Sequence, residues 1–197
     1  MPHLIAQGTI EAGHVRSLAR LLAGFHARSA TNEYIASFGR PDALRENWHE
    51  NFAQVTPYVG RTLRPSDFAV LRDYADETIA RRGPLFHRRA DARRVRDCHG
   101  DLRSDSIVIH EDGSICVMDC IEFSDRIRFG DVAGDVGFLA MDLDVRERRD
   151  LADELIGSYL GGVGDESFPL VLQFYKCYRA YVREKVESLL LDEPEVP

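Results

Sequence analysis

The sequence has little cysteine, and the cysteines it has do not form a disulfide pattern. Four of them stand among 197 residues, with spacings unlike those of the small secreted domains that disulfides hold together. We therefore expect free and mostly buried thiols, and a reducing, cytoplasmic environment. The four residues are Cys98, Cys116, Cys120 and Cys177.

Long apolar runs and an excess of positive charge are also missing. No segment approaches the roughly 18 consecutive apolar residues of a membrane-spanning helix, and residues 1–6 lack the features of a signal peptide. The formal net charge is −8, which disfavours nucleic acid as a partner because phosphate contacts require clustered Lys and Arg. The arginine-rich run over residues 81–94 is expected to be a solvated face. We predict no membrane and no nucleic-acid partner.

Helical periodicity dominates the chain before residue 95 and after residue 123. Apolar positions recur there every three or four residues, with proline at helix starts and glycine at helix ends. The pattern predicts helices over about 10–25, 42–54, 65–82, 131–143, 146–160 and 167–191. Gly83-Pro84 is expected to end the third of them. The acidic, proline-containing residues 192–197 predict a disordered tail.

Two short β-rich segments interrupt the helical pattern. Residues 106–110 and 114–118 are rich in Ile and Val, and Glu111-Asp112-Gly113 joins them. Asp-Gly between such runs is typical of a tight hairpin turn. The predicted fold class is therefore mainly α with a small β-hairpin (α+β), with room for one extra short strand.

The segment from His99 to Asp119 carries the chemistry. Phosphoryl transfer needs a carboxylate near the attacking hydroxyl and further oxygen ligands for magnesium. His99-Gly100-Asp101 begins a loop of the type H-R-D-x-x-x-x-N, with Ser106 where that pattern has asparagine. A hairpin follows and delivers Asp119 directly after its second strand. Because the hairpin folds back on itself, Asp101 and Asp119 are expected to converge.

The other polar residues of this segment have less specific roles. His99 is expected to pack beneath the loop and bond to backbone rather than shuttle protons. Ser106 is a poorer neutral magnesium ligand than asparagine, so it binds directly, binds through water, or leaves part of the task to Asp105. Glu122 either holds a metal-bound water or faces solvent.

Two other readings of the same residues stay open at this point. Zinc could be held by a cysteine and histidine set, although no C-x-x-C pair is present; the set is Cys98, His99, Cys116 and Cys120. A metal hydrolase built on two carboxylates would need more convergent acids or histidines than this loop offers.

The similarity to known phosphotransferases extends beyond the loop that begins at His99. Residues 98–103 read Cys-His-Gly-Asp-Leu-Arg, residues 118–123 read Met-Asp-Cys-Ile-Glu-Phe, and residues 128–133 read Arg-Phe-Gly-Asp-Val-Ala. With Phe138–Leu143 and the terminal helix around Phe174–Arg183, they resemble the aminoglycoside phosphotransferase-like family of small-molecule kinases. The chain resembles in particular a branch of that family sometimes fused to a P-loop ATPase half.

The resemblance implies a fold and a set of roles. It implies the C-terminal lobe of a protein-kinase-like fold over residues 1–191, composed of a helical part (1–94), a catalytic loop and hairpin (95–123) and C-terminal helices (124–191). It implies Asp101 as the catalytic base and Asp119 as a magnesium ligand, with Ser106 at the second ligand position. The remaining residues are implied to support the catalytic loop: His99, Arg103, Arg128, Asp131 and Asp135.

The implied activity is transfer of the γ-phosphate of ATP, with Mg²⁺, to a hydroxyl of a small molecule. However, residues 1–97 contain no glycine-rich loop between strands and no strand lysine, and the sequence has no G-x-x-x-x-G-K-[ST]. We therefore expect the nucleotide-binding N-lobe to be absent, and an N-lobe or ATPase domain to be a possible partner. The alternative is a catalytically silent lobe that binds or regulates another protein.

Overall fold

A computed structural model describes residues 1–192 of the chain. The described part is mainly helical, as the sequence predicts, with two small antiparallel sheets. One sheet is the predicted hairpin, and the other goes beyond the one extra short strand that the sequence allowed. The helices are α1 Pro2–Ala6, α2 Ala12–Arg28, α3 Glu33–Ser37, α4 Pro41–Val55, α5 Pro65–Asp91, α6 Asp125–Arg128, α7 Val132–Val145, α8 Arg149–Val163 and α9 Phe168–Leu190, with 3₁₀ turns η1 Thr56–Tyr58 and η2 Ser104–Ser106. The strands are β1 Val95–Asp97, β2 Ile107–Ile109, β3 Ile115–Val117 and β4 Phe129–Asp131.

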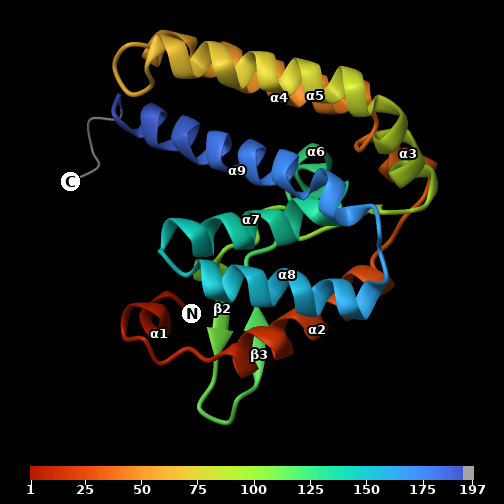
Figure 1. The fold of residues 1–197 in the computed structure, drawn as a ribbon, viewed down its shortest axis with the longest axis vertical. Coiled ribbons are helices and arrows are strands. Elements are labelled where there is room, and N and C mark those ends of the chain that lie inside the picture. Colours follow the sequence, from red (N-terminus) through yellow and green to blue (C-terminus); the bar gives the residue numbers. More distant parts are fainter. Residues whose placement is uncertain (193–197) are drawn as a thin grey trace.

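The helices stack in an order unlike their order in the chain. The pair α4 and α5 lies at one end of the molecule and the β2–β3 hairpin at the other, with α9, α7, α8 and α2 between them (Figure 1). Among residues 1–192, no helix is both long and apolar enough to cross a membrane. Of the predicted tail over 192–197, Asp192 accepts a hydrogen bond from Arg61 (3.2 Å), and the rest lies outside the described residues.

Both small sheets frame the segment that carries the chemistry. The predicted hairpin is confirmed: β2 and β3 pair with Ile107 opposite Val117, and Gly113 in the turn has φ +82°. In the second sheet, β1 pairs with β4 so that Val95 lies opposite Asp131. Because β1 and β4 flank residues 98–128, their pairing closes this segment into a loop with a fixed base.

Helix α7 forms the centre of the molecule. Eleven of its fourteen residues are buried, as expected for a helix that is covered on all sides. Its glycines allow α9 to approach closely: a Cβ at Gly137 would lie 3.4 Å from the Cβ of Tyr175. The polar residues of α7 therefore have defined positions in the core.

Helix α5 is longer than predicted. Gly83-Pro84 does not end it, and the helix continues to Asp91 with Pro84 inside. The expectation was wrong because burial of Leu85 and Phe86 offsets the hydrogen bond that proline removes. The extra turns also carry Arg89 into the core.

Arg89 is a buried cation, although its run was expected to be a solvated face. It donates from Nε to Asp131 (2.6 Å) and from Nη1 to Asp165 (2.9 Å), and all three side chains are at most 3% exposed. Burial acts to lower the pKa of Arg89, but the two carboxylates outweigh it and raise the pKa. The neighbouring Arg88 is exposed, so the expectation holds for that position and fails for Arg89.

Arg89→Ala should lower the free energy of unfolding by about 3–5 kcal/mol, because it leaves two buried carboxylates without their counterion. Urea denaturation measures this change. Arg88→Ala, one position away on the exposed face, should stay within about 0.5 kcal/mol of the parent. Equal effects of the two substitutions would contradict a central role for the buried pair.

Candidate active site

The loop that begins at His99 is fastened to the core by Asp135 of α7. The buried Asp135 carboxylate accepts hydrogen bonds from the backbone N–H groups of His99 (2.7 Å) and Gly100 (3.0 Å). His26 lies 3.2 Å from the same carboxylate and 2.8 Å from the Tyr159 hydroxyl. Since an ionised carboxylate only accepts, Nε2 of His26 donates to Asp135.

This set of donors determines the charge of Asp135. Burial acts to raise the pKa of the Asp135 carboxyl, but the hydrogen bonds from His26 and from the His99 N–H outweigh it and lower the pKa. The carboxylate is therefore charged at neutral pH, and it fixes the first residues of the loop.

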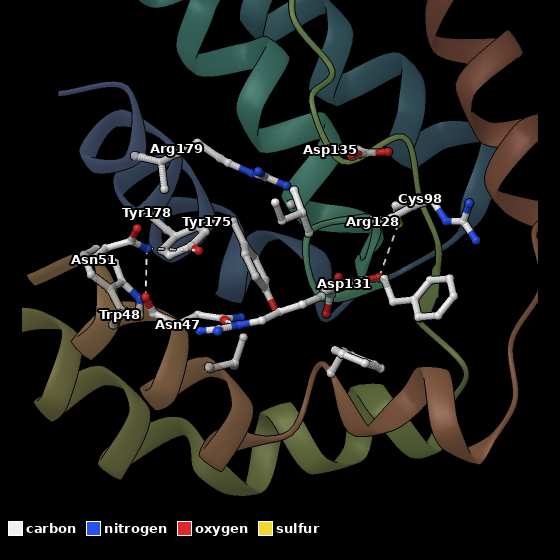
Figure 2. Close-up of a pocket in the computed structure, with 18 of the residues that line it drawn as sticks. Asn47, Trp48, Asn51, Cys98, Arg128, Asp131, Asp135, Tyr175, Tyr178 and Arg179 are labelled. Atoms are coloured by element: carbon white, nitrogen blue, oxygen red, sulfur yellow. Dashed lines mark hydrogen bonds between the residues drawn. The ribbon is translucent and has the colours of Figure 1, made fainter. Parts of the chain in front are cut away.

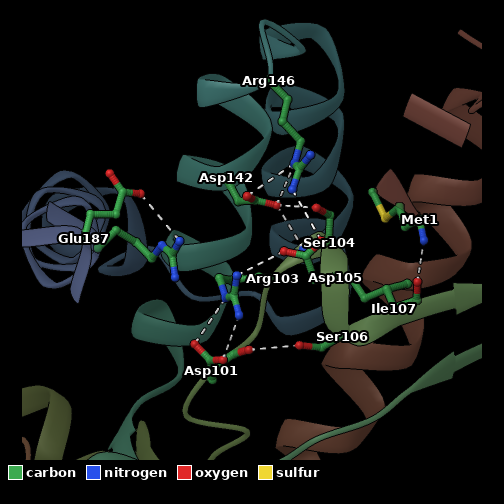
Figure 3. Close-up of polar contacts among 11 residues, drawn as sticks. Met1, Asp101, Arg103, Ser104, Asp105, Ser106, Ile107, Asp142, Arg146 and Glu187 are labelled. Carbon is green, nitrogen blue, oxygen red and sulfur yellow. Dashed lines mark hydrogen bonds and ion pairs between the residues drawn. The ribbon is translucent and has the colours of Figure 1, made fainter. Parts of the chain in front are cut away.

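A second acid on the same helix holds the other end of the loop. Asp142 accepts a hydrogen bond from the Ser104 N–H (3.0 Å), and also bonds the Ser104 hydroxyl and Arg146 (Figure 3). Asp142 follows Asp135 by seven residues, which is about two helical turns and the same face. The sequence analysis missed Asp142, and the signal available was the seven-residue spacing that places Asp135 and Asp142 on one face of a mostly apolar helix.

Asp101 lies between these two attachment points and faces one guanidinium group. Arg103 donates from Nε to one carboxylate oxygen of Asp101 (3.3 Å) and from Nη2 to the other (3.2 Å). Arg103 also donates from Nη1 to Asp105 (3.0 Å). The Asp101 side chain is 37% exposed, so its carboxylate is both oriented and open to solvent.

Ser106 supports the loop from below. It is buried, and its hydroxyl donates to the backbone carbonyl of Asp101 at 3.2 Å (Figure 3). The one proton of the hydroxyl is used in this bond, while its oxygen retains lone pairs. The hydroxyl of Ser106, the second candidate magnesium ligand, is therefore held beside the backbone of Asp101.

Asp119 has an unusual backbone conformation. Its φ is +60°, in the left-handed region that non-glycine residues rarely adopt, at a cost of about 1–3 kcal/mol. The side chain is exposed, and it makes no hydrogen bond or ion pair within residues 1–192. Strained, unpartnered polar residues of this kind cluster at functional sites.

Hydrogen bonds on both sides of Asp119 attach it to the loop. Met118 donates its N–H to the carbonyl of Ser106 (2.9 Å), and Ile121 donates its N–H to the carbonyl of His99 (2.9 Å). The His99 ring connects the two segments, because Nε2 donates to the carbonyl of Met118 (2.7 Å) and Nδ1 accepts from the Asp101 N–H (3.3 Å). One buried imidazole therefore fixes the backbone next to both acids.

The structure does not bring the remaining predicted residues to Asp101. Asp131 binds Arg89 and caps α7, and the Arg128 side chain pairs with Asp97 (2.8 Å). Asp131 and Asp135 were both expected to brace the loop; Asp135 does so, whereas the Asp131 carboxylate is occupied by Arg89. Glu122 is exposed and has no ion-pair partner in the described part of the chain.

The cysteines do not assemble a zinc site with His99. Cys116 and Cys120 are exposed, which corrects the expectation of mostly buried thiols, whereas Cys98 is buried. Cys98 does lie near His26 and Asp135. However, burial raises the pKa of the Cys98 thiol, and its Sγ donates to the carbonyl of Gly130 (3.3 Å). A protonated thiol beside a bonded His–Asp pair is a core network rather than a ligand set.

A cavity of about 320 Å³ lies beside the loop, between α4, α7, α9 and residues 124–131. One end of its wall contains Cys98, which precedes His99, and Asp135 (Figure 2). The other end contains Trp48 and Asn51, while the Arg179 guanidinium reaches toward Gly134, the neighbour of Asp135. Volumes of this order suit a small organic ligand.

The loop, Asp119 and helix α7 all lie in a region that matches a known protein family. A sequence profile of the phosphotransferase enzyme family matches residues 8–169. The chain belongs to this family, which confirms the resemblance drawn from its motifs. The matched region contains Asp101, Asp119 and all of α7.

Its relatives include Uncharacterized protein Rv2004c of Mycobacterium tuberculosis and Uncharacterized protein Mb2027c of Mycobacterium bovis. Each is 34% identical to this chain over 186 residues, which is 94% of this chain and 37% of the relative. The chain therefore spans a little over one third of the length of these relatives. No solved structure matches the chain.

Gly100→Ala should be more destabilising than its backbone angle alone requires. Gly100 has φ +84°, and an added Cβ would lie 3.0 Å from the carbonyl oxygen of Ile127. Gly113→Ala is the matched control, because Gly113 has φ +82° in open space. We expect about 1–2 kcal/mol for Gly113→Ala and a larger loss for Gly100→Ala in urea denaturation. Equal losses would mean that the loop does not need this close approach.

Asp135 should make stability depend on pH in acid. Because its pKa is lower when folded than when unfolded, its contribution is complete above the unfolded value of about 4 and is lost as pH falls through the folded value. Asp135→Asn should cost about 2–3 kcal/mol at neutral pH and flatten the pH dependence below pH 4. Urea denaturation across pH tests this, with the fully exposed Asp42→Asn as control. An unchanged slope in Asp135→Asn would exclude this role.

Proposed function

We propose that the protein transfers the γ-phosphate of ATP to a hydroxyl group of a small molecule. One observation carries the proposal: in a member of the phosphotransferase enzyme family, the buried His99 ring bonds to the backbone beside both Asp101 and Asp119. Both carboxylates are accessible and lie at the junction of one loop and one hairpin. Phosphoryl transfer depends chiefly on positioning of this kind.

In the proposed reaction, Asp101 is the catalytic base. The hydroxyl oxygen of the acceptor bonds to the γ-phosphorus, its proton passes to an Asp101 carboxylate oxygen, and the bond to the departing nucleoside diphosphate breaks. Each carboxylate oxygen has two lone pairs, so the contacts with Arg103 leave one on each for the acceptor. Arg103 would thus orient the base without blocking it.

The donor set suits magnesium. Asp119 offers a carboxylate that has no partner among residues 1–192. Ser106 offers a hydroxyl oxygen whose proton is already donated to the backbone carbonyl of Asp101. These two residues would hold Mg²⁺, with Glu122 as a candidate for a metal-bound water, and the bound ion would neutralise charge on the nucleotide phosphates. Binding of Mg²⁺ to Asp119 would then offset the free-energy cost of its strained backbone.

We further propose that the chain acts as the C-terminal lobe of a kinase-like enzyme and receives part of its nucleotide site from elsewhere, as an N-lobe or an ATPase domain. Large apolar side chains flank Asp119: Met118 is 43% exposed and Phe123 is 81% exposed. Exposed apolar groups next to a site suit coverage by a second body. Exposed free thiols at Cys116 and Cys120 suit a reducing cytoplasm.

Asp101→Asn should reduce the turnover of a hydroxylated substrate by about 10²–10⁴-fold, which is the usual contribution of a general base. Release of ADP in a coupled assay, with ATP and Mg²⁺, measures this. Asp112→Asn in the exposed hairpin turn is the control and should leave turnover unchanged. If Asp101→Asn is as active as the parent, Asp101 is not the base.

The alternative is a catalytically silent lobe, which Ser106 in place of asparagine favours. Calorimetric titration with Mg-ATP separates the two functions. Micromolar binding that Asp119→Asn weakens, and that disappears when EDTA removes the metal, supports the phosphotransferase. Binding that is indifferent to Asp119 and to magnesium would favour the silent lobe.

A further inference from the structure

We propose that the cavity between α4, α7 and α9 binds the anionic group of the phosphate acceptor, so that the acceptor is a small hydroxylated organic anion held by Arg179 and Lys185. The shared chemistry is a carboxylate or phosphate group on a compact, partly apolar body. The identity of the bound anion as the phosphate acceptor rests on the proposed function. The binding of an anion rests on the cavity alone.

The acids in the cavity wall already have partners. Asp131 is bound by Arg89, and Asp135 accepts hydrogen bonds from His26 and two backbone N–H groups. Glu50 pairs with Arg126, which also donates to Asn47 (2.6 Å). Each of these carboxylates therefore has fewer lone pairs free for a cationic ligand.

Within residues 1–192, two cations of α9 form no ion pair, although the charge of Asp135 acts on Arg179 and that of Glu50 on Lys185 from beyond ion-pair distance. Arg179 stacks over the Phe138 ring (4.9 Å) and near the Tyr178 ring (5.9 Å), and within residues 1–192 it forms no ion pair. Its buried Nε has no acceptor in the described part of the chain. Lys185 donates to the neutral Oδ1 of Asn51 (2.6 Å), and burial lowers the pKa of its ammonium group. Figure 2 shows Arg179 extending from α9 toward the cavity.

The remaining polar atoms of the wall add donors rather than acceptors. The Tyr175 hydroxyl and the Trp48 Nε1 are buried without a hydrogen-bond partner among the described residues. Burial raises the pKa of Tyr175 well above its ordinary value, so the hydroxyl keeps its proton and can donate. Buried donors of this kind are costly unless a ligand satisfies them. Several oxygen atoms carrying negative charge would satisfy them together.

The cavity contrasts with the molecule around it. The chain as a whole has a formal net charge of −8, which by itself would suit a cationic substrate. The cavity instead contains Arg179 and Lys185, which form no ion pair among the described residues, between aromatic walls of Trp48, Phe174 and Tyr178. Since guanidinium groups bind carboxylate and phosphate in matching geometry, a polycationic acceptor is excluded from this cavity and an anionic one is selected.

The test compares four compounds that share a hydroxylated ring and differ in charge. They are 4-hydroxyphenylacetate, 4-hydroxybenzylphosphonate, the neutral 4-hydroxyphenethyl alcohol and the cationic tyramine. Binding to the full chain is followed by saturation-transfer NMR and thermal shift, without nucleotide. We expect both anions to bind more tightly than the alcohol, and tyramine to bind least. The carboxylate and phosphonate arms show which oxyanion the cavity prefers.

Charge removal then locates the site. Arg179→Gln and Lys185→Gln should each weaken anion binding by about tenfold or more, and Arg179→Lys should retain part of it. Arg183→Gln is the matched control, because Arg183 lies one turn further along α9 and pairs with Glu187. Circular dichroism melting of each variant shows that it is folded.

The two proposals fail in different ways. Equal responses to the four compounds, including no response to any, would overturn the anion site, as would full anion binding by folded Arg179→Gln and Lys185→Gln proteins. Asp101→Asn should bind the anions as the parent does. Anion binding without phosphoryl transfer would therefore refute the proposed function alone.

Discussion

The carboxylate of Asp135 is the constraint on which the site depends. It lies in the middle of α7, where a charge is tolerated only because His26 and two backbone N–H groups donate to it. Those two N–H groups belong to the first residues of the loop. The loop thus supplies hydrogen bonds that the buried Asp135 carboxylate needs. Moving the loop would leave this charge without two of its donors.

Helix α7 fixes the positions of both ends of the loop. Asp135 and Asp142 hold its two ends, and Asp101 with Arg103 projects from the stretch between them. Arg89 secures the helix itself by binding Asp131 at its N-cap. A helix that carries so much of the core is hard to displace, which gives a loop of irregular backbone the rigidity that positioning requires.

The sequence predicts the helices, the hairpin and the family better than the contacts between distant segments. Helical periodicity and the Asp-Gly turn are local signals, and the helices and the hairpin follow them closely. Pro84 inside α5, the buried Arg89 and the role of Asp142 depend on contacts between segments distant in the chain, such as Arg89 with Asp131 and Ser104 with Asp142, which are 42 and 38 positions apart. Local propensity carries no information about such contacts. For the same reason, the sequence predicts a bracing role for both Asp131 and Asp135 and does not reveal that Arg89 occupies Asp131.

The loop and the cavity answer separate questions. Membership of the phosphotransferase enzyme family identifies the reaction class, and in the proposed function the loop, with His99 between Asp101 and Asp119, positions the two acids. The cavity is formed by α4, α7, α9 and residues 124–131, and Asp135 belongs both to its wall and to the support of the loop. Arg179 and Lys185, by contrast, form no hydrogen bond to the loop in the described part of the chain. In the proposed function, these two cations would therefore select the charge of the acceptor, while Asp135 keeps the loop in place.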